Sequence, residues 1–152
     1  MIIEARLEEL GITLPEAAAP VASYQPLVVS GQTAYISGQL PFVDGKLVTG
    51  KLGADVSLEQ GQAAARACGL MIMAQLKAAG LLERVEQVVK LGGFVASTPD
   101  FTDQPKVVNG TSDLMFEVFG DAGRHARSAV GVPVLPLDAA VEVDAIVALR
   151  PA

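Results

Sequence analysis

The sequence is poor in the residues on which several kinds of site depend. Its 152 residues include one cysteine, Cys68, one histidine, His125, and no tryptophan. A single cysteine cannot form a disulfide within the chain, and one cysteine with one histidine does not make an intrachain zinc site. The sequence therefore predicts neither an internal disulfide nor a bound metal.

Charged residues are also few, at 18% of the chain, and the acids outnumber the bases to give a net charge of −6. An acidic chain without a dense cluster of Lys and Arg repels phosphate backbones, so nucleic acid is a poor candidate partner. No apolar run approaches the length of a membrane span, and Glu4 stands where a signal peptide needs basic residues. We therefore expect a cytoplasmic protein.

Apolar residues, in contrast, are abundant and make up 51% of the chain. The length suits one domain, so we expect residues 1–152 to form a single domain with one core. So large an apolar share exceeds that of a typical soluble monomer, which indicates that other subunits cover part of the surface. The composition thus predicts a homo-oligomer.

The spacing of apolar and turn residues predicts alternating helices and strands. The longest expected helix begins at Ser57, which has capping-box spacing with Gln60, and ends at Gly80. The other expected elements are a short helix over residues 2–10, a β-hairpin of residues 27–29 and 34–36, a tight turn at Asp44-Gly45, a buried strand near residues 85–96 in which Gly92-Gly93 marks a bulge or a close backbone approach, and a helix capped by Thr102 or Asp103 that Asn109-Gly110 could break.

The last two apolar runs, residues 127–134 and 140–149, are expected to pair as an antiparallel hairpin. Depending on where the turn is centred, Arg127 then lies opposite Asp144 or opposite Glu142. One interpretation is an exposed cross-strand salt bridge, which would stabilise the fold little. The other is a site in which the planar fork of Arg127 binds a ligand carboxylate and an acid positions or deprotonates a water.

Several short segments recur in a characteristic order: Ala34–Pro41, the Gly92–Val95 strand, the helix that contains Asn109, His125–Ser128 and Val141–Ile146. Their order resembles that of the RidA (YjgF) family over most of residues 20–149, and the form of residues 123–132 resembles a distinct branch of it. The resemblance implies an α+β fold like that of chorismate mutase of the small trimeric type. Such a fold has a mixed sheet with two helices packed on one face, and three subunits with clefts between them.

The resemblance also implies an activity, the hydrolysis of reactive 2-imino or enamine acids to 2-keto acids and ammonia without a cofactor, as in 2-iminobutanoate/2-iminopropanoate deaminases. It assigns the binding of the substrate carboxylate to Arg127. It assigns the attacking water to Asp144, with Glu142 as the possible substitute. Ser37-Gly38 and Tyr24 match residues that line the cleft.

Two residues depart from the family's pattern. Asp144 is one methylene shorter than the usual glutamate, which could move a catalytic oxygen by about an ångström and cost about a hundredfold in rate. Ala129 stands where many members have a cysteine. The alternative function is therefore a trimer that binds small keto acids without turnover. An endoribonuclease or translation inhibitor, as some relatives are described, fits the acidic charge poorly.

Three further residues have simpler interpretations. His125 lacks an orienting acid nearby in the sequence, so we expect a surface residue rather than a catalyst. Cys68 falls on the apolar face of the long helix, where a free thiol behaves as a small apolar side chain. Tyr24, taken without the resemblance, would be a wedge between the connector and the first strand. The substrate side chain, and the residues of a neighbouring subunit that complete the cleft, do not follow from the sequence.

Overall fold

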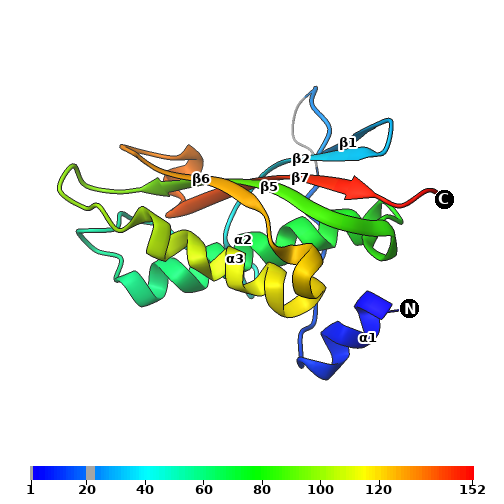
Figure 1. Cartoon of the computed structure of the whole chain (residues 1–152). Coiled ribbons are helices and arrows are strands. Elements are labelled where there is room, and N and C mark those ends of the chain that lie inside the picture. The colour runs from blue at the N-terminus through cyan, green and yellow to red at the C-terminus, as the bar shows by residue number, and fades with distance from the viewer. Residues whose placement is uncertain (1, 20–22) are drawn as a thin grey trace.

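A computed structural model describes residues 2–19 and 23–152, and it shows one mixed sheet with its long helices on a single face (Figure 1). In chain order the elements are α1 (Ile2–Glu9), β1 (Leu27–Ser30), β2 (Thr33–Gln39), β3 (Phe42–Val43), β4 (Lys46–Leu47), α2 (Leu58–Ala78), β5 (Val85–Ala96), α3 (Gln104–Phe119), β6 (Ala126–Val132) and β7 (Val141–Leu149), with short 3-10 turns at Leu82–Arg84, Gly120–Gly123 and Pro136–Asp138. This is the expected α+β arrangement with two helices packed on one face.

The long helix α2 forms where the capping signals predict it. The Ser57 hydroxyl accepts a hydrogen bond from the Gln60 N–H, and the Gln60 side chain accepts one from the Ser57 N–H. Beyond its C-terminus Gly80 adopts φ +74°, a conformation that a side chain would strain. The helix lies beside α3 against the sheet, so both expected helices are confirmed.

The glycine in α3 serves packing and does not interrupt the helix. A Cβ at Gly110 would overlap the carbonyl oxygen of Gln62 in α2. The missing side chain therefore lets the two helix backbones approach closely, and this contact outweighs the helix-breaking tendency of Asn109-Gly110. As a result α3 runs unbroken from Gln104 to Phe119.

Alternation along the strands divides the sheet into two faces. In β7 every second residue from Val141 to Leu149 is buried under the helices, and the residues between them are half-exposed. On the other face, Val28, Tyr35 and Val130 are exposed apolar side chains. None of the described helices covers that face, which we call the open face (Figure 1).

The expected antiparallel hairpin of residues 127–134 and 140–149 is wrong. The strand order is β1-β2-β7-β5-β6, with β5 parallel to β6 and antiparallel to β7. β5 lies between β6 and β7, so the segment after β6 crosses β5 and β7 pairs along its other edge. The residues opposite Leu91 are therefore Arg127 on one side and Ala145 on the other.

The double glycine of β5 marks close approaches. The register shifts of this strand lie between Val85 and Lys90, before the glycines. A Cβ at Gly92 would overlap the Asp144 carboxylate, and one at Gly93 would come within 2.6 Å of Val108 in α3. The two glycines thus face opposite sides of the sheet. Gly92 leaves room for the Asp144 carboxylate, and Gly93 leaves room for α3.

Candidate functional site

Arg127 lies on the helix-covered face, at the β6 edge of the sheet. Its Nη1 donates to Asn109 Oδ1 at 2.9 Å and to Ser112 Oγ at 3.0 Å, and its Nη2 donates to the Pro105 carbonyl at 3.2 Å. A guanidinium has five N–H donors, so Nε and Nη2 each keep one without an acceptor among the described residues. The contacts with α3 fix the plane of the guanidinium and leave two donors for a ligand.

The two carboxylates that interrupt the apolar series of β7 lie on the open face. Glu142 and Asp144 are both half-buried, and they stand two residues apart in β7. Burial raises the pKa of Glu142, and repulsion from Asp144 adds to the rise. Burial also raises the pKa of Asp144, although the Gly92 N–H and the charge of Lys90 oppose that rise. Neither carboxylate forms an ion pair with the residues that the structure describes.

A β-bulge in β2 brings a glycine against one of these acids. Ile36 pairs with Ala145 and Gln39 with Val143, so Ser37 and Gly38 together stand opposite a single residue of β7. A Cβ at Gly38 would overlap Oε2 of Glu142, so the carboxylate occupies the volume that a side chain would fill. Bulges often re-aim side chains beside active sites. Here the Glu142 side chain lies against the bulge at Ser37-Gly38, the strand end that the family resemblance predicts to line a cleft.

The loop before β1 is tied to the same strand end. The Ser37 hydroxyl donates to the Gln25 carbonyl at 2.8 Å, and the Ser37 N–H donates to the Pro26 carbonyl at 2.9 Å. Tyr24, the next residue back, is 48% exposed. That Tyr24 lines a cleft stays a prediction. A side chain packed as a wedge between the connector and the first strand would be less exposed than Tyr24 is.

The expected juxtaposition of Arg127 with an acid does not occur within one subunit. Arg127 shares its face with buried Leu91, while Gly92 and Asp144 share the open face. Since β5 separates the two strands and the side chains point to opposite faces, both the salt bridge and the direct Arg-acid pair are wrong. The structure does bring Ser37 and Gly38 together with both acids: Gly38 lies against Glu142, and Ser37 lines a cavity with Asp144.

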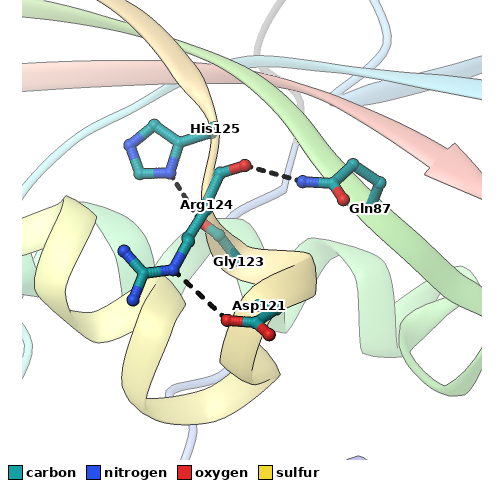
Figure 2. A network of polar contacts seen from close by, with 5 residues as sticks. All are labelled: Gln87, Asp121, Gly123, Arg124 and His125. Atoms are coloured by element: carbon teal, nitrogen blue, oxygen red, sulfur yellow. Dashed lines mark hydrogen bonds and ion pairs between the residues drawn. The ribbon is translucent and has the colours of Figure 1, made fainter.

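A hydrogen-bonded group of His125, Ser112 and the Gly123 carbonyl does not follow from the sequence. His125 is half-buried, with Nδ1 2.7 Å from the Gly123 carbonyl and Nε2 2.8 Å from Ser112 Oγ. In Figure 2 its ring turns toward Gly123, whereas Arg124 extends toward Asp121. His125 is thus partly exposed, and hydrogen bonds engage both nitrogens of its ring. The available signal was Ser112, which follows Asn109 by three residues and so shares a face of α3.

The remaining candidates are structural. Cys68 is fully buried in α2, and burial raises the pKa of its thiol well above the ordinary value, so a nucleophilic thiolate is disfavoured. Within residues 2–19 and 23–152, no three His, Cys, Asp or Glu side chains cluster closely enough to hold a metal ion. None of the described helices is long and apolar enough to cross a membrane.

A mixed sheet with two helices on one face, acids on the other and an anchored arginine at the edge defines a small α+β domain of the chorismate-mutase-like type. The family described as "YjgF/chorismate mutase-like, putative endoribonuclease" matches residues 4–149. The chain belongs to this family, as the order of its motifs predicts.

Individual relatives agree over nearly the whole chain. Protein TCP17 of Trypanosoma cruzi is 55% identical over 97% of this chain and 94% of its own length. The structure of the protein Atu1372 from Agrobacterium tumefaciens is 49% identical with a TM-score of 0.89, and the match covers 99% of this chain and 93% of Atu1372. E. coli TdcF with bound serine is 25% identical with a TM-score of 0.66, and the match covers 90% of this chain and 94% of TdcF.

Proposed function

We propose that the protein hydrolyses small 2-imino or enamine acids to 2-keto acids and ammonia, in a cleft that two copies of the chain complete. The observation that carries this proposal is the seat of Glu142, a half-buried carboxylate of raised pKa that fills the space above Gly38. Family membership and the serine bound to TdcF support a small amino-acid-like ligand.

Glu142 is suited to handling the water in this reaction. Hydrolysis of an imine joins a water oxygen to the carbon of the C=N bond and passes a proton to the nitrogen, which later leaves as ammonia. A carboxylate whose pKa is raised toward the working pH accepts a proton from the water and returns it more readily than an ordinary one. Both acids adjoin the Ser37-Gly38 strand end, since Asp144 stands opposite the bulge. Glu142 is favoured because its carboxylate fills the space above Gly38, whereas the Asp144 carboxylate lies against Gly92.

Arg127 would hold the substrate carboxylate with the two donors that α3 leaves free. Since this residue and Glu142 lie on opposite faces of one sheet, the pair must come from neighbouring subunits. The position of β6 at the sheet edge and the exposed apolar side chains of the open face support such an assembly. We expect a homotrimer, as the family resemblance implies.

The test is an assay of imine hydrolysis. 2-Iminobutanoate is generated from threonine by a dehydratase, and semicarbazide traps whatever the protein has not hydrolysed. Wild type should lower the yield of semicarbazone, and Glu142→Gln should not. Glu86→Gln, which changes an exposed glutamate on β5, is the matched control and should behave as wild type. If wild-type protein does not lower the semicarbazone yield, the proposed activity on this substrate is wrong.

The second candidate is a keto-acid-binding protein without turnover. It is favoured by the separation of Arg127 from both acids, because an anchored arginine can bind a carboxylate with no acid beside it. This alternative predicts that 2-oxobutanoate raises the melting temperature in a concentration-dependent way while no ammonia is released from imines. A steep dependence of RNA binding on salt would instead favour the endoribonuclease description.

A further inference from the structure

Ser112 and His125 form a hydrogen-bonded pair in a cavity that Arg127 also lines. The cavity has a volume of about 370 Å³ and is lined mainly by α3 and by the segment that leads into β6. Ser112 Oγ and His125 Nε2 are 2.8 Å apart, and both residues are half-buried. The imine chemistry proposed above does not use either side chain.

The protonation of the pair follows from its partners. Gly123 offers Nδ1 a carbonyl oxygen, which can only accept, so Nδ1 carries the proton. In a neutral imidazole Nε2 is then the acceptor, and the Ser112 hydroxyl donates to it. The Gly123 carbonyl is well placed to hold the ring, because a Cβ on Gly123 would overlap the Met115 carbonyl oxygen and the turn is therefore packed against α3.

This arrangement matches the serine-histidine pair of nucleophilic hydrolases, with a backbone carbonyl in place of the acid that orients the histidine. Arg127 Nη1 donates to Ser112 Oγ at 3.0 Å, which stabilises the negative charge that a nucleophilic serine develops. The remaining donors of Arg127 are available for the oxyanion of an attacked carbonyl.

The charges around the cavity indicate the class of substrate. Arg124 and Arg127 both line it, with one lining acid, Asp113. Arg124 is paired at 3.3 Å with Asp121, which does not line the cavity, so Arg127 is the cation without an acid partner among the described residues. The Arg124 guanidinium stacks over the Phe116 ring at 4.3 Å from its centroid, which holds the cation at the cavity wall. A small acyl donor that carries a negative charge suits such a cavity better than a neutral one.

We propose that Ser112 is a nucleophile and His125 its general base in the hydrolysis of small anionic carboxylic esters. Ser112 Oγ bonds to the ester carbonyl carbon while its proton moves to His125 Nε2. The bond to the leaving oxygen then breaks, and the alcohol departs with that proton. Water, deprotonated by His125, attacks the acyl-serine, and the bond to Oγ breaks to release the acid and restore the hydroxyl.

Two chromogenic esters test the proposal, neutral 4-nitrophenyl acetate and anionic 4-acetoxy-3-nitrobenzoate. Wild type should hydrolyse both and prefer the anionic one by about fivefold in kcat/KM, an estimate for one added solvent-exposed ion pair. Mass spectrometry of acid-quenched protein should find an acetyl group on Ser112. Absence of hydrolysis, or acetylation of another residue, would overturn the nucleophile. Preference for the neutral ester would overturn the substrate class.

Variants separate chemistry from positioning. Ser112→Ala should abolish both turnover and acetylation, and Ser128→Ala, which changes an exposed serine on β6, should not. His125→Gln can still accept the Ser112 hydrogen bond but cannot take the proton, so acetylation should slow by about a hundredfold or more at an unchanged melting temperature. Acetylation of His125→Gln at the wild-type rate would show that His125 is not the base.

The ester reaction shares Arg127 with the proposed imine reaction but uses a different catalytic group, the Ser112 hydroxyl. The imine assay reads the yield of semicarbazone, whereas the ester assay reads the acetyl group on Ser112. The imine assay can fail while Ser112 is still acetylated, and the reverse also holds, so failure of one proposal is distinguishable from failure of the other.

Discussion

The two faces of the sheet present their polar groups in different ways. On the helix-covered face Arg127 is anchored by three hydrogen bonds to α3. On the open face Glu142 and Asp144 have raised pKa values, no ion-pair partner among the described residues, and glycines in place of neighbouring side chains. The first region is preorganised within the subunit, whereas the acids of the second have only the more distant charge of Lys90 and no cation paired with them among the described residues. A neighbouring subunit that supplies the cation would complete it.

The largest expected effect distinguishes the two acids of the open face. Glu142→Gln should lower kcat for imine hydrolysis by about 10² to 10⁴-fold, the usual contribution of a general base. Asp144→Asn should lower it by less than about tenfold, because the Asp144 carboxylate lies against Gly92 and not above Gly38. The semicarbazide assay measures both variants. If Asp144→Asn lowers kcat more than Glu142→Gln does, the attacking water belongs to Asp144, as the family resemblance implies.

The next effect concerns the helix-covered face. Arg127→Lys should lower kcat/KM by about a hundredfold, mainly through KM, since an ammonium cannot reproduce the planar fork or its contacts with Asn109 and Ser112. Arg66→Lys is the matched control, because the ion pair of Arg66 with Glu117 is partly exposed. Unchanged kinetics in Arg127→Lys would mean that Arg127 only ties β6 to α3.

A smaller effect tests the bulge itself. Gly38→Ala should displace the Glu142 carboxylate and lower kcat by about tenfold to a hundredfold, as a shift of about an ångström would. Gly92→Ala is the paired variant, because it crowds Asp144 in the same way. If the two variants lose equal activity, the comparison between the acids fails. Circular dichroism and thermal melting check that each variant is folded.

The smallest effect is on stability. The pKa values of Glu142 and Asp144 are raised in the folded state, so the folded protein binds more protons and its stability falls as the pH rises through and beyond their ordinary pKa values. Glu142→Gln should therefore raise the melting temperature at pH 7 by about one to two degrees, a small gain because water screens a half-exposed carboxyl. The gain should vanish near pH 3.5. A gain that is larger at pH 3.5 than at pH 7 would contradict the assigned shifts.

Local signals in the sequence predicted the elements well. The Ser57 cap, the Gly80 terminus and the Asp44-Gly45 turn all lie where their residue types require, and Asp44 and Gly45 both have the positive φ of a two-residue hairpin turn. These signals work because each depends on residues close together in the chain. The family order of motifs likewise identified the fold class and the family.

Strand order failed because it depends on contacts between distant residues. No residue pattern within β6 or β7 indicates that β5 lies between them, and strands adjacent in sequence most often pair, so the local signals predict a hairpin that the sheet does not contain. The same limit hid the Ser112 and His125 pair, which joins the middle of α3 to the start of β6. Glu142 and Asp144 were found from alternation alone, but only the packing of Gly38 distinguishes their surroundings.

The central position of β5 also bears on how the molecule moves. Its backbone pairs on one edge with the strand that carries Arg127 and on the other with the strand that carries both acids. Neither edge can separate from the sheet without breaking the ladder at Leu91 and Gly92. Amide hydrogens of β5 should therefore exchange with solvent only in the rarest openings, and the arginine and the acids should keep their spacing.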